Sequence, residues 1–372
     1  MGKADTTPGM QYGAAALTLL AVLVTGWFFV SGGYAKWRDE RSVADACDGT
    51  VSVGQARALL DTDDVSGDTS HSDAGGKSPD GSSPPVICWL DGPGGYKQRA
   101  VVRTEWRSKA WGPHTVSGRE AQTCTAALPV PIGGGWTGMV NLKGEGAAAT
   151  VVLKCRNTTG PRAGDSLSLF VNSWGSRPYK EAAQRVRLAR FATQTAQAAA
   201  REYGCDARSG GRIGPVIPLD YGRETYPDAP ALAGVSGTCE GVTPGWLIRR
   251  AHGTAVGDAP VEDCLLIDDQ GRPLFRLSAY YGTFADEQRF KTQTTRDLPK
   301  ADPLLTDFLF RAEATCPGSP RHAVFAIDYR AYDDDPKPQH RYARAALRQF
   351  AERSTAHHGC TDVKLFQEAA RS

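Results

Sequence analysis

Four cysteines recur in the same order and in matching local sequence in each half of this chain. This repetition constrains the fold more than any other feature. Cys47 begins CDGTVSVGQARALL and Cys239 begins CEGVTPGWLIRRA; Cys88 begins CWLDGPGGYKQRAVVRTEW and Cys264 begins CLLIDDQGRPLFRLSAYYG. In the second pair, an apolar stretch leads through a Gly-containing turn into a strand of alternating character, which is typical of a β-hairpin.

The correspondence continues to the end of each half. Cys155 ends the apolar run ATVVLKC and Cys316 ends FLFRAEATC, and another apolar strand follows each after a short loop. Each half then closes with a helix that runs into Gly204-Cys205 or Gly359-Cys360. Glycine is the usual residue where a helix ends in a left-handed conformation. The pattern predicts two tandem copies of one module.

A chain of 372 residues is long enough for two such modules, each with its own core. We expect an α+β class, each module an antiparallel sheet with helices packed on one side. We place copy 1 at residues 42–205 and copy 2 at residues 238–362, with a linker at 206–237 and a C-terminal tail at 363–372. Residues 61–85 are rich in Ser, Gly, Asp and Pro, which is typical of a disordered insertion.

The N-terminal segment from Gly13 to Val30 reads GAAALTLLAVLVTGWFFV and carries no charge. As a helix, a segment of this length approaches the bilayer core thickness of about 30 Å. We expect residues 13–31 to be a transmembrane signal anchor, with residues 1–12 in the cytoplasm. A cleavable signal peptide, with Gly33 and Ala35 before the cut, is the alternative. We favour the anchor, because Lys3 is the one basic residue ahead of a long apolar run.

Two patterns disagree about the side of the membrane. Lys36, Arg38 and Arg41 follow the apolar segment, which favours a cytoplasmic C-terminal part. The nine cysteines are widely spaced, and no CxxC pair suggests zinc or redox chemistry. Widely spaced cysteines in an exported chain favour disulfides. We give the cysteines more weight and expect the bulk of the chain to be extracellular.

The order of four cysteines allows three pairings in each copy. We prefer first with second and third with fourth, because this pins the first helix to the first hairpin and the last helix to the strand that it must cover. The preferred disulfides are Cys47–Cys88, Cys155–Cys205, Cys239–Cys264 and Cys316–Cys360. Cys124 has no counterpart in copy 2, so we expect a free thiol; pairing of Cys124 in place of a neighbour is the alternative.

The order of these elements resembles that of a broad group of actinobacterial (Streptomyces-type) envelope proteins. Its members are secreted lipoproteins and membrane-anchored proteins with a cysteine before a short helix, a second cysteine opening a hairpin, further strands and a closing Ala/Arg-rich helix. The resemblance covers most of Cys47 to Cys360 and implies an envelope location and an α+β fold. It carries no catalytic residues. The lipidated cysteine of the lipoproteins is missing, because no cysteine precedes Cys47.

One motif suggests catalysis. Gly164-Asp165-Ser166-Leu167 spells the GDSL signature of a family of serine esterases. A polar turn precedes it, and the Asp-x-x-His that would supply the base, Asp68 to His71, lies upstream in the insertion. A serine without a positioned base is inert. We therefore expect no catalytic residue and no enzyme; a surface serine hydrolase built on Ser166 is the alternative.

A metal site is suggested by His357, His358 and Cys360 at the end of the last helix. Their spacing matches no standard zinc pattern, and Cys360 is assigned to a disulfide. Histidines are also favourable beside the carbonyl end of a helix. We therefore expect no metal site and no cofactor.

Arginines on both closing helices are the remaining candidates for function, namely Arg187, Arg190, Arg341 and Arg344, as an anion-binding set. The alternative is the solvated face of an amphipathic helix. Because such arginines occur in both copies, we expect a non-catalytic membrane protein that binds an envelope polymer or a partner protein. A scaffold that only assembles membrane partners is a further alternative. The net charge of +2 gives no reason to expect nucleic acid.

Overall fold

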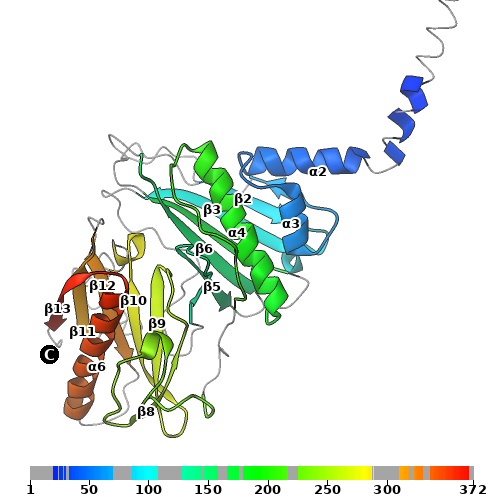
Figure 1. Cartoon of the computed structure of the whole chain (residues 1–372). Coiled ribbons are helices and arrows are strands. Elements are labelled where there is room, and N and C mark those ends of the chain that lie inside the picture. The colour runs from blue at the N-terminus through cyan, green and yellow to red at the C-terminus, as the bar shows by residue number, and fades with distance from the viewer. Residues whose placement is uncertain are drawn as a thin grey trace, which may run out of the picture.

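Two antiparallel sheets with helices packed against them form the α+β architecture of the chain (Figure 1). The computed structural model describes residues 20–23, 25–27, 29–30, 33–69, 86–107, 128–143, 146–157, 166–175, 179–216, 225–286, 288, 310–317, 322–329 and 336–367.

Sheet A has seven strands in the order β1-β2-β3-β7-β6-β5-β4. The strands are β1 (Ser66–Asp68), β2 (Val86–Asp91), β3 (Arg99–Arg107), β4 (Val130–Pro131), β5 (Gly138–Lys143), β6 (Gly146–Lys154) and β7 (Ser166–Trp174). The helices of this part are α2 (Gly33–Ala46), α3 (Val53–Leu60), η1 (Gly95–Lys97) and α4 (Ala182–Glu202). One core joins the apolar side of α4 to a face of the sheet.

Sheet B has six strands in the order β13-β11-β12-β10-β9-β8. The strands are β8 (Ile248–Gly253), β9 (Val261–Asp268), β10 (Pro273–Tyr280), β11 (Phe310–Thr315), β12 (His322–Tyr329) and β13 (Thr361–Gln367). The helices are η3 (Gly237–Cys239) and α6 (Pro336–His357). Leu347 and Phe350 of α6 join the core on one face of this sheet.

The four central strands have the same order in both sheets, β2-β3-β7-β6 in sheet A and β9-β10-β12-β11 in sheet B. Their registers also agree. The paired residues run Cys88–Val102, Val102–Val171 and Val171–Ala149 across sheet A, and Cys264–Leu277, Leu277–Ile327 and Ile327–Phe310 across sheet B. When these two rows of paired residues are aligned, each position on the central strands of copy 1 has a corresponding position in copy 2.

Both closing helices end as the glycines predict. Gly204 and Gly359 have φ values of 70° and 64°, which lie in the left-handed region that glycine adopts without strain. The amide of Cys205 then donates to Ala200 O at 2.7 Å, and the amide of Cys360 donates to Thr355 O at 2.8 Å. At the end of each helix, a carbonyl of the last turn therefore accepts a hydrogen bond from the cysteine that follows the glycine.

The structure contains four disulfides, and these are the pairs preferred from the sequence. They are Cys47–Cys88, Cys155–Cys205, Cys239–Cys264 and Cys316–Cys360. Several disulfides in one chain are typical of an extracellular protein. Cys124, expected to be a free thiol, lies outside the described residues.

The faces of the two sheets that carry no closing helix pack on each other. Met139 and Phe170 of sheet A share an apolar cluster with Val261 and Tyr280 of sheet B. The rings of Phe170 and Phe284 have centroids 6.5 Å apart. Because α4 and α6 cover the other faces, both closing helices lie on the outside of this pair of sheets.

A charged pair is buried on this face of sheet B. Arg276 of β10 forms an ion pair with Asp263 of β9, and Ser278 donates a hydrogen bond to Asp263 at 2.5 Å. Burial lowers the pKa of Arg276, but the charge and hydrogen bond of Asp263 outweigh this effect, so the pKa is raised overall. Arg276 is therefore charged and paired in the folded protein.

Three segments differ from the expected boundaries. Residues 66–68 of the expected disordered insertion form β1, which pairs with β2 by backbone hydrogen bonds; residues 70–85 lie outside the described residues. Part of the expected linker is packed, since Val216 is fully buried. The expected tail from 363 is also wrong in part, because β13 runs to Gln367 and pairs with β11.

Helix α2 packs on copy 1. The buried carboxylate of Asp39 pairs with Arg57 at 2.9 Å and accepts from the amide of Val65 at 3.3 Å. Of the expected transmembrane segment, residues 13–19, 24, 28 and 31 lie outside the described residues. Within the part of the chain that is described, no helix has the length and apolar character needed to cross a membrane.

Candidate functional site: an arginine groove along α6

Helix α6 has one apolar side and one basic side. Ala343, Leu347 and Phe350 are buried against sheet B. Arg341, Arg344 and Arg348 are exposed, and residues at this spacing lie on one side of a helix. The same periodicity that packs α6 therefore also gathers three guanidinium groups into one stripe.

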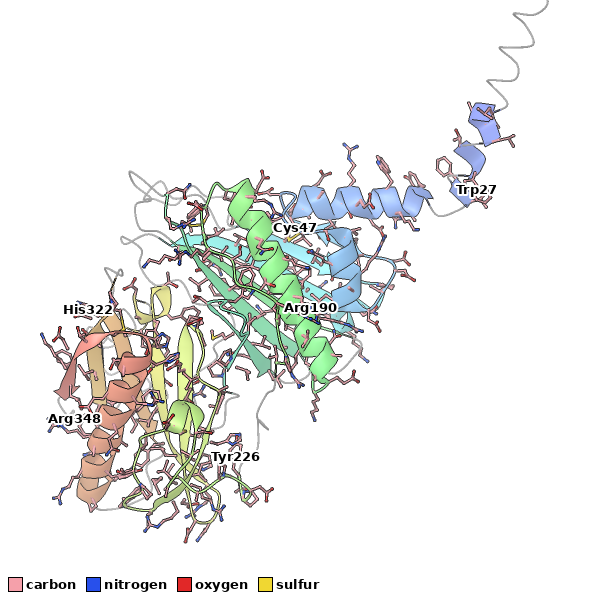
Figure 2. The ribbon with its side chains drawn as sticks, in the orientation of Figure 1. Trp27, Cys47, Arg190, Tyr226, His322 and Arg348 are labelled. Atoms are coloured by element: carbon pink, nitrogen blue, oxygen red, sulfur yellow. A yellow bond between two sulfur atoms is a disulfide. The ribbon has the colours of Figure 1, made fainter. Side chains whose placement is uncertain are left out.

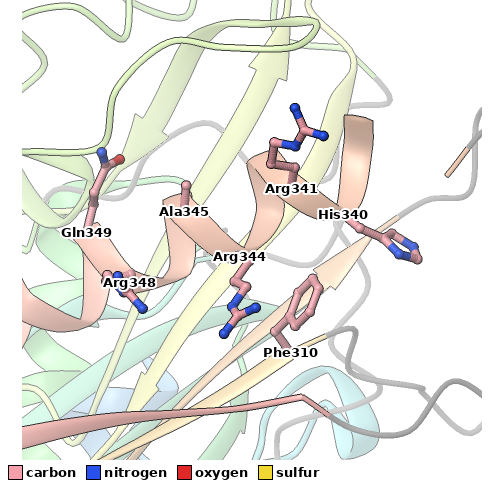
Figure 3. Close-up of a pocket in the computed structure, with 7 residues that line it drawn as sticks. All are labelled: Phe310, His340, Arg341, Arg344, Ala345, Arg348 and Gln349. Atoms are coloured by element: carbon pink, nitrogen blue, oxygen red, sulfur yellow. The ribbon is translucent and has the colours of Figure 1, made fainter. Parts of the chain in front are cut away.

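This stripe borders a groove of about 560 Å³, shown in Figure 3. The volume falls within the range of about 300–1,000 Å³ that is usual for small-ligand sites. The lining residues are Phe310, His340, Arg341, Arg344, Ala345, Arg348 and Gln349. Phe310, from the start of β11, meets the ring of His340 edge-on with centroids 6.1 Å apart. The groove thus combines an aromatic contact with three cations.

The electrostatics of the groove favour an anion. No Asp or Glu is among the described residues that line it. Over the described ranges, Arg341, Arg344 and Arg348 form no hydrogen bond or ion pair, whereas Arg353 on the same helix pairs with Glu240 at 2.6 Å. Guanidinium groups bind carboxylate and phosphate oxygens in a bidentate manner. The three arginines are therefore available for an external oxyanion.

The structure divides the predicted anion-binding set. Arg341 and Arg344 line the groove together with Arg348, but Arg187 and Arg190 belong to α4, which covers the other sheet. Figure 2 labels Arg190 and Arg348 on their separate helices. Aligned on the closing cysteines, Arg190 corresponds to Ala345 and Arg187 to Tyr342. The arginines of the two copies are therefore alike in composition and not in position.

In copy 1 the corresponding flank of the helix is covered. Ala189, the counterpart of Arg344, is fully buried, as is Val216. Arg185, the counterpart of His340, donates to Val216 O at 2.8 Å. The chain that follows Cys205 thus packs against this flank of α4, which corresponds to the side of α6 that borders the groove in copy 2.

The serine of the GDSL motif lies at the first position of β7 and is buried. Its neighbours across the sheet are Arg107 and Lys154. Asp68 lies on β1, which is separated from β7 by β2 and β3, and His71 lies outside the described residues. Asp68, the described member of the Asp-x-x-His pair, is therefore not a neighbour of Ser166 in the sheet.

No sequence pattern pointed to Phe310, His340 or Gln349 as part of this site. Gln349 holds the turn at Thr243, whose amide donates to Gln349 Oε1 at 3.0 Å. The signal for the arginine stripe was present in the sequence as helical spacing. The signal for the groove was not, because the open flank depends on the path of the chain after Cys360.

No protein-family model, curated protein or solved structure matches this chain.

Proposed function

We propose that this chain is a membrane-anchored extracellular protein of the cell envelope, without catalytic activity, that binds an oxyanion-bearing polymer or partner in the groove along α6. The single observation that carries the proposal is the stripe of Arg341, Arg344 and Arg348 around a groove with no described acidic lining. Cations that line a concave surface without partners are a common signature of anion recognition.

The location follows from different features. Four disulfides support an oxidising compartment, and the uncharged N-terminal segment at 13–31 supports a single-pass anchor. The resemblance to actinobacterial envelope proteins supports the same location. Because α2 directly follows the anchor and packs on copy 1 through Asp39, copy 1 is the part next to the membrane. Copy 2, which carries the groove, then lies farther from the membrane.

The spacing of the arginines suggests the form of the ligand. Arg341 and Arg348 are two turns apart on α6, which is roughly 10 Å along the helix axis. Guanidinium groups spread over that length are matched better by several oxyanions than by one carboxylate or phosphate. A ligand with several oxyanions in a row, such as a phosphodiester or polycarboxylate chain, can contact all three. We therefore favour an anionic polymer over a small anion.

The test is binding of the purified full-length protein to inorganic polyphosphate and, in a separate arm, to poly-glutamate. Polyphosphate reports a phosphate ligand and poly-glutamate a carboxylate ligand. We expect Arg344→Ala to weaken binding about 10-fold or more, consistent with loss of one charge-assisted contact of about 1.5–3 kcal/mol. The variant with Arg341, Arg344 and Arg348 all changed to alanine should lose binding, while keeping its melting temperature.

Arg190→Ala is the matched control, because it removes an exposed arginine at the corresponding part of α4. It should leave the affinity unchanged. If Arg190→Ala weakens binding as much as Arg344→Ala, the attraction is a general surface charge effect and the groove is not the site. If neither polymer binds, the proposed function is wrong.

A further inference from the structure

A second cluster of polar side chains lies at the opposite end of α6 from the arginine groove. His357 is the last residue of the helix, His358 follows it, and Glu262 comes from β9. The candidate ligand atoms of these three residues all lie within 4.8 Å of one another. The chain thus brings two imidazoles and one carboxylate together from segments far apart in sequence.

The carboxylate of Glu262 is nearly fully buried, with a side-chain exposure of 4%. Its Oε1 lies 2.9 Å from His358 Nε2, and its Oε2 accepts a hydrogen bond from Ser354 at 2.6 Å. The hydroxyl of Tyr281 lies 2.5 Å from Ser354 Oγ, and its ring packs on His358 with centroids 3.9 Å apart. Both carboxylate oxygens are thereby held in place by neighbours.

In copy 1, the corresponding helix α4 packs on sheet A without such a cluster of polar side chains. The shared cysteine positions and strand register match Glu262 with Val86, His357 with Glu202, His358 with Tyr203, Ser354 with Ala199 and Tyr281 with Trp106. A buried carboxylate costs free energy that an aliphatic side chain does not. Because copy 1 has valine at the position that corresponds to Glu262, the shared strand pattern does not require a carboxylate there.

We propose that Glu262, His357 and His358 form a binding site for a divalent transition-metal ion of the Zn²⁺ class. Two imidazoles and a carboxylate are a ligand set that suits zinc, with a fourth position for water or an external ligand. Imidazole ligands disfavour calcium and magnesium, which prefer oxygen.

The geometry is close to what the ion needs. Ligand bonds of about 2.0–2.1 Å place the ligand atoms of a tetrahedral zinc site roughly 3.3 Å apart. The buried Glu262 and the partly buried His358 are already close, and His357 is exposed, so binding of an ion requires mainly that the His357 ring move closer to the other two. Ser354 then supports the carboxylate from outside the ligand shell, in the manner of outer partners in zinc proteins.

The site is independent of the proposed anion-binding function, since its residues do not line the arginine groove. Its effect on the fold is specific. A bound ion would join the end of α6 to β9, whereas the disulfide Cys316–Cys360 joins the same end of the helix to the end of β11. The metal would therefore tie α6 to a second strand of sheet B.

The experiment is a calorimetric titration of the full-length, metal-free protein with Zn²⁺, together with Co²⁺ as a spectroscopic substitute. We expect one equivalent to bind, and visible bands typical of tetrahedral Co²⁺. His357→Ala should weaken binding at least 10-fold, because even loss of an outer-shell partner costs about 10–100-fold. Glu262→Gln should do the same. His340→Ala, on the same helix in the arginine groove, is the control and should bind as the parent does.

A second variant separates metal loss from unfolding. It introduces the copy 1 residues together, as Glu262→Val, Ser354→Ala, His357→Glu and His358→Tyr. Because copy 1 is stable with these residues, we expect this variant to fold with an unchanged circular dichroism spectrum and to bind no metal. The proposal is overturned if the parent binds no Zn²⁺ at micromolar concentration. It is equally overturned if His357→Ala binds as tightly as the parent, or if the folded four-residue variant still binds one equivalent.

Discussion

Copies 1 and 2 share a frame and differ in the path of the chain after the closing helix. Both have four central strands in the same order and register, a closing helix and two disulfides at corresponding positions. After Cys205 the chain runs across the flank of α4 and buries Val216. After Cys360 it turns at once into β13 and pairs with β11, which leaves the flank of α6 open. The segment after the closing helix therefore decides whether a copy has a groove.

The two copies also differ in buried charge. On β9, copy 2 has Glu262 and Asp263 where β2 of copy 1 has Val86 and Ile87. Arg276, the partner of Asp263, likewise corresponds to Val101 in copy 1. The apolar residues Ile87 and Val101 of copy 1 thus occupy the positions that hold the ion pair of Asp263 and Arg276 in copy 2. This comparison shows which polar groups the frame can do without.

The largest effect that we expect comes from breaking the buried pair. Asp263→Ala removes the main partner of the buried Arg276 and leaves only the charge of Asp328 to compensate it, so it should lower the free energy of unfolding by about 3–5 kcal/mol. Replacing both residues by their copy 1 counterparts, as Asp263→Ile with Arg276→Val, should recover part of that loss, because the buried guanidinium group is removed together with its main partner. Urea denaturation of the three proteins measures both values. A double variant as unstable as Asp263→Ala would show that the copies are not interchangeable here.

The next largest effect is the loss of stability when one disulfide is removed, and we expect it to be equal in the two copies. The disulfides Cys155–Cys205 and Cys316–Cys360 span sequence separations of 50 and 44 residues. Loops of this size differ little in closure entropy, so removing either bridge by changing both cysteines to serine should cost about 4 kcal/mol. The melting temperatures of the two variants provide the measurement. A cost that is much larger in one copy would mean that its neighbouring packing depends on the bridge.

The smallest effect should distinguish the covered flank from the open one. Arg185 donates to the carbonyls of Val216 at 2.8 Å and Tyr179 at 3.0 Å, and burial lowers its pKa. Arg185→Met should cost about 1–3 kcal/mol, because it leaves buried carbonyls without a donor. His340→Ala, at the corresponding position of α6, should cost less, about 1 kcal/mol or below, because His340 is only partly buried and its main loss is the contact with Phe310. Equal costs would indicate that the flank of α6 is also covered in solution.

Much of the frame could be predicted, because the spacing of apolar residues and the sequences around the cysteines indicate its strands and helices. The strands around Cys88 and Cys264, the two closing helices and the left-handed glycines all have local signals in the sequence. Strand β1 has none, since Ser66–Asp68 is polar and is held by pairing with β2 and by contact with α2, where the amide of Gly67 donates to Ser42 Oγ at 3.2 Å. Strand β13 does alternate, with Val363 and Leu365 packed toward the core, but its position after the last cysteine led to its assignment as a tail.

The candidate sites were harder to predict because they depend on contacts between distant segments. Helical spacing shows that Arg341, Arg344 and Arg348 share a side, but no local pattern shows that this side stays open. The histidines at the end of α6 were considered with Cys360, which is bonded to Cys316. Their partner is Glu262, on a strand far upstream, and only the fold brings it near.

The placement of the disulfides also has a mechanical consequence. All four bridges close loops inside one copy, spanning 41, 50, 25 and 44 residues, and none of them joins copy 1 to copy 2. When the chain is pulled between its two ends, the backbone inside an intact loop cannot lengthen, because the tension passes through the sulfur–sulfur bond. Three stretches between the bridges have no such bypass, namely residues 89–154, 206–238 and 265–315. Under load, the four closed loops therefore cannot lengthen, and these three stretches, one in each copy and one between the copies, carry the full tension along their own backbone.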